Sequence, residues 1–365
     1  MRSGSPEAHG SNNFDFVRVV AALCVVVSHQ YALNGLPEPT FLNVHTLGGL
    51  GVLIFFSVSG YLVAQSWTAD PHPLRFAARR LLRIWPALAL VILVCTFVWG
   101  PLVSPLGWRE YLRHPAVPEY LRNLIFSMKG ALPIHLDGNA LPYAVNGPLW
   151  TIPLELQCYL ALAVLGLAGL LRSVWWVAAL TAALVVRYAV VEARGDQLAD
   201  ILGWTLEQHF LLEFGLFFAA GTILHHVHLA RPWHRPALFG LTLSAGTIAI
   251  LLGRPLLGLW LIVPCTVVLV GTAATPYLRR AGRFGDPSYG LYIFAFPIQQ
   301  TLIWLNKGRL GWTTLFLLTL LACFAAAFAS WHLVEKRVLR LKPRRPRAAP
   351  SRRLDLPSNT VPGRP

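Results

Sequence analysis

Long apolar runs separated by short polar segments dominate the chain, and their lengths fit membrane-spanning helices. Most runs approach the roughly 20 residues that an α-helix needs to cross the hydrocarbon core of a bilayer. We predict an all-α, polytopic membrane bundle with about ten transmembrane helices; because only Arg172 separates two of the runs, nine or eleven remain open. The predicted spans are Phe14–Leu33, Leu47–Trp67, Ile84–Val103, Leu149–Leu171, Ser173–Val191, Leu206–His226, Ala237–Leu252, Leu256–Thr275, Tyr289–Asn306 and Thr313–Val334.

Composition and charge agree with a membrane protein. Hydrophobic residues make up 55% of the chain and charged residues 13%, against about 25% charged residues in a soluble domain. If the N-terminus is cytoplasmic, the inner segments carry 21 of the 31 Lys and Arg residues and the outer segments carry eight. The positive-inside rule then predicts that both termini are cytoplasmic. The net charge of +15 is therefore read as an orientation signal, and no nucleic-acid partner is expected.

The chain is predicted to form one membrane domain, residues 1–341, followed by a short tail. Residues 342–365 are rich in Pro, Arg and Ser, so we expect a disordered, basic, cytoplasmic tail that can rest on anionic membrane lipid. The five cysteines lie in apolar spans without a CxxC pair, which is typical of packing residues. The histidines at 225, 226 and 228 indicate an interfacial loop, so no metal site is predicted.

The first span carries ionisable residues, which are costly at membrane depth and usually functional. Arg18 and His29 are eleven residues apart, which places them within about 20° of one helix face and about 16 Å apart along the axis. Asp15, three residues before Arg18, falls on the same face. The alternative is a buried polar group that helps helices associate.

Small residues mark the second span. Gly48, Gly51, Ser59 and Gly60 allow close approach of another helix or of a ligand. For this span alone, ordinary helix packing is slightly the better interpretation.

A basic cluster precedes the third span. Arg80 and Arg83 are one helical turn apart, so their guanidinium groups, with Arg79 beside them, can converge on one phosphate group. Pro86 suits the first turn of the predicted span. Topology alone would also explain basic residues at this position.

Two prolines and a carboxylate mark the entry of the fourth span. Pro148 and Pro153 interrupt regular hydrogen bonding, which a membrane tolerates where the backbone lines a cavity or is covered by protein. Glu155 then enters the apolar run and needs a partner. A contact with His29 would fix the tautomer of the imidazole and strengthen it as a base.

Taken together and in order, these motifs resemble the membrane acyltransferases of family 3, which O-acetylate bacterial polysaccharides, peptidoglycan, nodulation factors and macrolides. Four positions depart from the family pattern: Tyr61 replaces Phe, Thr151 replaces Ser, Cys158 replaces Phe, and Ala295 replaces a frequent His. No catalytic role therefore transfers to Ala295. The matching segments are Arg18–His29, Gly51–Leu62, Arg79–Pro86, Leu149–Tyr159, Ser288–Pro297 and Glu335–Lys336.

The resemblance implies that acetyl-CoA is the acyl donor and binds from the cytoplasmic side. It implies that His29 is the general base, or carries the acyl group on its imidazole, and that Glu155 orients it. The residues that the resemblance places at the donor are Arg18, Arg79, Arg80, Arg83, Ser59, Trp150, Ser288 and Tyr289.

The sequence thus predicts an integral O-acyltransferase of the bacterial inner membrane. It would move an acetyl group from cytoplasmic acyl-CoA to a hydroxyl of an extracytoplasmic polysaccharide or glycolipid, alone or through a periplasmic partner transferase. The aromatic outer segment 104–146 is expected to face the acceptor. A transporter or flippase for a glycan or lipid-linked substrate is the alternative.

Overall fold

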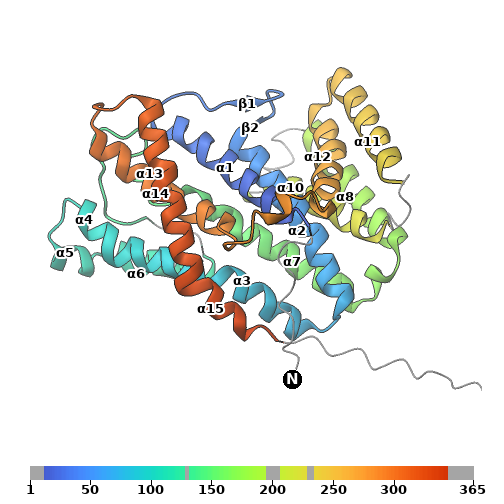
Figure 1. The fold of residues 1–365 in the computed structure, drawn as a ribbon, viewed down its shortest axis with the longest axis horizontal. Helices are drawn as coiled ribbons and strands as arrows, with labels where there is room; N and C mark the ends of the chain where they lie inside the picture. The colour runs from blue at the N-terminus through green and yellow to red at the C-terminus, as the bar shows by residue number, and fades with distance from the viewer. Residues whose placement is uncertain (1–11, 128–130, 195–205, 228–233, 344–365) are drawn as a thin grey trace, which may run out of the picture.

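The computed structural model describes residues 12–127, 131–194, 206–227 and 234–343, and this part of the chain is mostly helical (Figure 1). A short antiparallel hairpin of β1 (Thr40–Phe41) and β2 (His45–Thr46) precedes the second helix. The long helices are α1 (Phe14–Leu33), α2 (Leu47–Ala69), α3 (Pro73–Val94), α7 (Thr151–Leu167), α8 (Val174–Arg194), α10 (Leu206–His226), α11 (His234–Leu251), α12 (Pro255–Thr272), α13 (Ser288–Asn306) and α14 (Trp312–Ser330). The short ones are α4 (Gly100–Val103), α5 (Trp108–Arg113), α6 (Ala116–Leu121) and α15 (Lys336–Val338).

The all-α, multi-pass architecture predicted from the apolar runs is confirmed. Each predicted span overlaps one of the long helices. Within the described residues, six helical segments are long and apolar enough to cross a membrane. That all ten helices cross, and that both termini are cytoplasmic, remain predictions, and most of the predicted tail, 344–365, lies outside the described residues. The six segments are Phe14–Leu33, Leu47–Ala69, Pro73–Val103, Gly147–Leu167, Pro255–Thr272 and Trp312–Leu341.

The third helix begins earlier than its apolar run. Pro73 occupies its first turn, and the His72 side chain caps it by accepting a hydrogen bond from the backbone N–H of Arg75 at 3.4 Å. Pro86 therefore lies inside α3, and its predicted first-turn position is wrong. The error arises because the first three turns are basic, so hydropathy places the start of the helix too late. The arginines of the basic cluster consequently project from a helix and not from a loop.

Helix α2 lies at the centre of the packing, with α1 and α10 against it, while α13 packs between α1 and α14. Its glycines make these contacts possible. A Cβ on Gly60 would lie 1.9 Å from the carbonyl oxygen of Phe218 in α10, and one on Gly51 would lie 2.5 Å from that of Ala21 in α1. Most of the small residues of the second span therefore serve helix packing.

The molecule has two distinct edges (Figure 1). The hairpin lies at the upper edge of the view, and α15 and the start of α3 lie at the lower edge. Helix α1 runs antiparallel to α2, because Phe14 stacks on Tyr61 and Gly48 packs against Ser28. We call the end that holds Ser28 and the hairpin the hairpin side. The other end, which holds Arg18, is the arginine side.

Candidate active site

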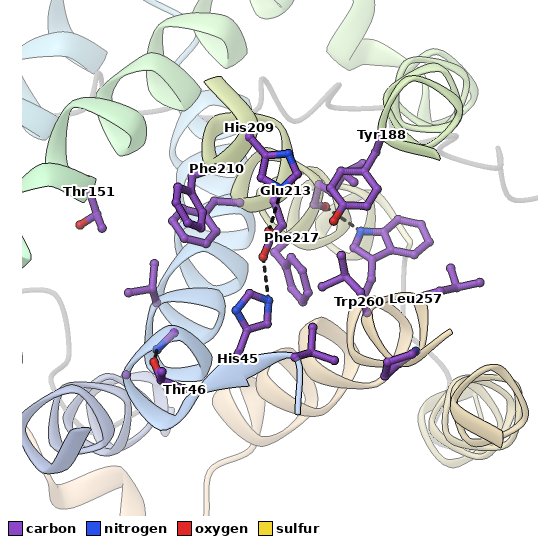
Figure 2. A pocket seen from close by; sticks show the side chains of 18 of the residues that line it. His45, Thr46, Thr151, Tyr188, His209, Phe210, Glu213, Phe217, Leu257 and Trp260 are labelled. Atoms are coloured by element: carbon purple, nitrogen blue, oxygen red, sulfur yellow. Dashed lines mark hydrogen bonds and ion pairs between the residues drawn. The ribbon is translucent and has the colours of Figure 1, made fainter. Parts of the chain in front are cut away.

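A cavity of about 1250 Å³ opens on the hairpin side. Side chains from α1, α2, α7, α8, α10 and α12 line it together with the hairpin, and Figure 2 shows part of its wall. Of the predicted site residues, His29 and Trp150 line this cavity. Trp150 packs against Phe210 and Phe214 of α10, with ring centroids 5.0 Å and 5.9 Å apart. The other predicted residues do not line it.

His29 lies in the last turns of α1, where the helix reaches the cavity. Its ring meets Phe296 of α13 edge to face at 5.3 Å. Its Nδ1 atom is buried, and no described residue forms a hydrogen bond with it. The preceding residue, Ser28, donates a hydrogen bond to Glu38, which also lines the cavity. An imidazole with an unused ring nitrogen at a cavity wall is suited to take a proton or to carry a group.

Glu155 has other partners than the one predicted for it. Its Oε1 accepts hydrogen bonds from Ser59, at 2.7 Å, and from Tyr159. Ser59 lies eleven residues along α2 from Gly48, which packs against Ser28, the residue before His29, so the two levels are separated by roughly 16 Å of helix axis. The prediction that Glu155 orients His29 is therefore not supported by the geometry. The reason is depth, because Glu155 meets the middle of α2 and His29 its hairpin end.

Two tyrosines of α13 lie at different depths in the bundle. Tyr292 lines the cavity and shares a hydrogen bond of 2.6 Å with Thr151 at the start of α7. One turn earlier, the hydroxyl of Tyr289 is buried without a hydrogen-bond partner among the described residues. It lies within electrostatic reach of both Glu155 and Arg83. Tyr289 thus connects the middle of the bundle with the arginine side.

On the arginine side, Arg79 is neutralised by a carboxylate. Its Nη1 lies 2.7 Å from Asp70 Oδ2, and Arg75 binds both oxygens of the same carboxylate at 2.9 Å and 2.6 Å. These hydrogen bonds, from Arg75 first and Arg79 second, hold the pKa of Asp70 well below its usual range. Arg79 therefore joins α3 to the end of α2, and its guanidinium is not free to bind a phosphate group.

Arg18 and Arg83 converge on Asp286, which follows α12 and precedes α13. Arg18 binds it at 2.9 Å and Arg83 binds the same oxygen, while the Ser288 hydroxyl donates to the other oxygen at 2.5 Å. Burial alone would raise the pKa of Asp286, but the charges of Arg18 and Arg83 bring it below its usual range. Asp15 and Glu335 complete this cluster, at Arg18 and Arg83 respectively.

Arg80 differs from its neighbours. Among the described residues no carboxylate lies within ion-pair distance of its guanidinium, and its nearest polar contact is the Ser66 hydroxyl at 3.5 Å. Its Nε is buried without a hydrogen-bond partner in the same part of the chain. Arg80 and Arg83 thus have separate partners and do not converge as their spacing predicted.

Comparison with known proteins decides the family. The family model described as "Acyltransferase domain" (family 3) matches residues 11–333. The chain belongs to this acyltransferase family. It is 31% identical over 336 residues to the "O-acetyl transferase" of Shigella phage Sf6, covering 91% of this chain and 97% of the relative.

Two further relatives have different names. "Nodulation protein 10" of Rhizobium leguminosarum bv. viciae is 27% identical, over 93% of this chain and 97% of its own length. "Acyltransferase MdmB" of Streptomyces mycarofaciens is 24% identical, over 90% of this chain and 91% of its own length. No solved structure matches significantly. The resemblance read from the motifs is confirmed, and the protein is a membrane acyltransferase.

Two residues of segment 104–146, which is predicted to be outer, form packing contacts. Tyr111 is fully buried and donates to the carbonyl of Thr96 at 3.0 Å, and Asn139 donates to the side chain of Gln300 at 2.6 Å. None of the described residues of 104–146 lines the large cavity, and that the segment faces the acceptor remains a prediction.

Sequence reasoning missed the cavity residues Glu38 and His45 and gave Glu213 no role. A carboxylate inside an apolar span was the available signal for Glu213. For Glu38 and His45 no comparable signal exists in the sequence.

Proposed function

We propose that this acyltransferase transfers an acyl group, with acetyl as the first candidate, from acyl-CoA to a hydroxyl group of a polysaccharide or glycolipid. The donor would reach the enzyme from the arginine side, taken as cytoplasmic, and the acceptor would occupy the cavity on the hairpin side, facing the periplasm. The bacterial inner membrane is the corresponding location. The family match supports an enzyme and gives no support to the transporter alternative.

The observation that carries the proposal is the position of His29. It lies on the wall of the large cavity with a ring nitrogen unused by any described residue, on the same helix as Arg18 at the other side. As general base, His29 would accept the proton of the acceptor hydroxyl. The hydroxyl oxygen would then bond to the acyl carbon, the C–S bond of the thioester would break, and the proton would pass to the leaving thiolate.

A covalent version uses the same residue. The imidazole of His29 would attack the thioester, release the thiol and pass the acyl group to the acceptor hydroxyl. A periplasmic partner transferase could take the acyl group at this point. Glu155, bound to Ser59 and Tyr159 at mid-depth, is not assigned a contact with His29 in either version.

The ion-pair partners of the arginines change which of them we assign to donor binding. Arg18 and Arg83 face Asp15, Asp286 and Glu335, so this cluster holds no surplus positive charge for a phosphate group. Arg80, whose guanidinium has no carboxylate within ion-pair distance in the described part of the chain, fits an anionic donor best. We therefore assign the phosphate contact to Arg80 and treat Ser59, Ser288 and Tyr289 as residues of the route between the two sides.

The proposal is tested by transfer of labelled acetyl from acetyl-CoA into membrane glycan. Wild-type enzyme should incorporate label, and His29→Ala should reduce incorporation by about 10³-fold or more, because it removes the base of the first version and the nucleophile of the second. His332→Ala, which removes an exposed histidine of the same chain, is the matched control and should retain activity. Full activity in His29→Ala, with normal expression and membrane insertion, would refute both versions.

A further inference from the structure

A second polar cluster lies in the same cavity. Glu213 of α10 projects between His45 of β2 and His209 one turn earlier on α10 (Figure 2). His45 Nε2 lies 2.7 Å from Glu213 Oε1, and His209 Nε2 lies 3.9 Å from Oε2. The side chain of Glu213 is 5% exposed. No function has been assigned to this cluster above.

The hydrogen-bonding capacity of Glu213 is largely unused. The contact with His45 is close but not aligned as a hydrogen bond, and neither Glu213 Oε1 nor His45 Nε2 has another hydrogen-bond partner among the described residues. A buried carboxylate is costly unless its oxygens accept hydrogen bonds. Oε1 is buried against His45, so Oε2, which faces His209 across 3.9 Å, is the oxygen available to a hydroxyl or N–H donor of a ligand that enters the cavity.

Aromatic side chains surround the carboxylate. Trp260 of α12 and Tyr188 of α8 lie beside Glu213 in Figure 2, with Phe210 on the other side. The indole of Trp260 is held in place by its N–H, which donates to the carbonyl of Leu216 at 2.8 Å. A flat apolar face next to a carboxylate suits a sugar ring, which presents C–H groups on its faces and hydroxyls at its rim.

We propose, on the basis of the function proposed above, that Glu213, with His45 and His209, forms the acceptor subsite for a neutral pyranose. Glu213 Oε2 would accept a hydrogen bond from one ring hydroxyl, with His45 holding Oε1 and His209 beside Oε2, while Trp260 and Tyr188 cover the ring. The cavity volume exceeds the range of about 300–1000 Å³ usual for small-molecule sites, so it has room for a second sugar unit. The subsite would thus hold one unit of the glycan while His29 acts on another hydroxyl.

The test is sugar binding by the full chain in lipid nanodiscs, followed by saturation-transfer NMR. The probes are the methyl α-glycosides of glucose, galactose and mannose, each against its analogues with one ring hydroxyl removed. The wild type should bind at least one intact glycoside and bind one of its deoxy analogues more weakly. Glu213→Gln should weaken binding by about tenfold or more, the usual result of losing a hydrogen bond to a charged group.

The control is Glu119→Gln, an exposed residue of α6 outside the cavity, which should bind like the wild type. His209→Gln changes a partly exposed side chain, so it tests the subsite with little risk to folding, and a several-fold loss is expected. Wild-type affinity in both Glu213→Gln and His209→Gln would overturn the subsite. So would the absence of glycoside binding by the wild type, or selective binding of methyl α-glucosaminide, which would mean that Glu213 recognises a cation.

Failure of the subsite and failure of the proposed function give different results. Acetyl-CoA should raise the melting temperature of both wild type and Glu213→Gln, because the donor side is unchanged. Stabilisation by acetyl-CoA without glycoside binding would reject the subsite alone. Glycoside binding without stabilisation by acetyl-CoA and without transfer would reject acetyl-CoA as the donor, while the sugar-binding site would stand.

Discussion

At the scale of single residues, this protein pairs almost every buried charge with an opposite one. Arg79 meets Asp70, and Arg18 and Arg83 share Asp286, each by direct hydrogen bonds. Buried pairs of this kind stabilise little by themselves, but breaking one leaves an uncompensated charge. Against this background His29 stands out, because its ring nitrogen has no such partner among the described residues. The neutralised groups are therefore structural, and His29 is the candidate for chemistry.

Asp70→Asn should destabilise the protein by roughly 1–3 kcal/mol at neutral pH, because Arg75 and Arg79 lose a charged acceptor. The depressed pKa of Asp70 also determines how stability changes with pH. Its contribution to stability is fully present above the ordinary carboxyl pKa of about 4 and is lost as pH falls below that value. In detergent, the melting temperature of the wild type should therefore fall steeply as the pH is lowered, and that of Asp70→Asn should fall less steeply.

The matched control for this prediction is Asp137→Asn, whose side chain is 85% exposed in the outer segment. It should unfold like the wild type at every pH tested. An Asp70→Asn variant as stable and as acid-sensitive as the wild type would show that the two arginines do not depend on this carboxylate.

At the scale of helices, the glycines of α2 determine how closely its neighbours approach. Gly60 packs against the backbone of Phe218, and Gly221 of α10 packs against Ser57 in return, with a Cβ-to-oxygen distance of 2.2 Å. The helices therefore meet backbone to backbone, so a clash introduced at this contact could not be relieved by moving a flexible side chain. The wall of the cavity depends on this contact, because α10 also carries His209 and Glu213.

Gly60→Ala should separate α2 from α10 and destabilise the protein by about 1–3 kcal/mol, the usual range for overpacking. Unfolding of the purified protein by heat measures this directly. Gly215→Ala is the matched control, since a Cβ there meets nothing within 4 Å and Ala favours a helix over Gly. Equal melting temperatures for Gly60→Ala and Gly215→Ala would contradict the packing described.

The helices could be predicted from the sequence, but the side-chain contacts between them could not. Apolar runs of membrane length mark α1 and α2 almost to the residue, because hydrocarbon thickness fixes span length. The start of α3 was missed because its arginines interrupt the run, although Pro73 was an available signal for a first turn. Asp286 is 268 residues from Arg18, and no local pattern reports such a pair. Likewise, pattern alone placed Glu155 with His29, whereas the packing depth of α7 against α2 gives it to Ser59.

At the scale of the whole molecule, two chemical environments lie at opposite ends of α1. The arginine side holds the ion pairs and Arg80, whereas the hairpin side holds the large cavity, with His29 and Glu213 in its wall. Tyr289 and the Ser59–Glu155–Tyr159 group lie between them. This arrangement fits an enzyme whose donor and acceptor are on different sides of a membrane.

The central claim is therefore transfer across the bilayer, and sealed inverted inner-membrane vesicles test it most directly. Labelled acetyl-CoA is supplied only to the outside, which is the cytoplasmic face in such vesicles. The account predicts labelled glycan protected in the lumen for the wild type and none for His29→Ala. Label found only in glycan on the donor side, or equal luminal label in both proteins, would contradict it.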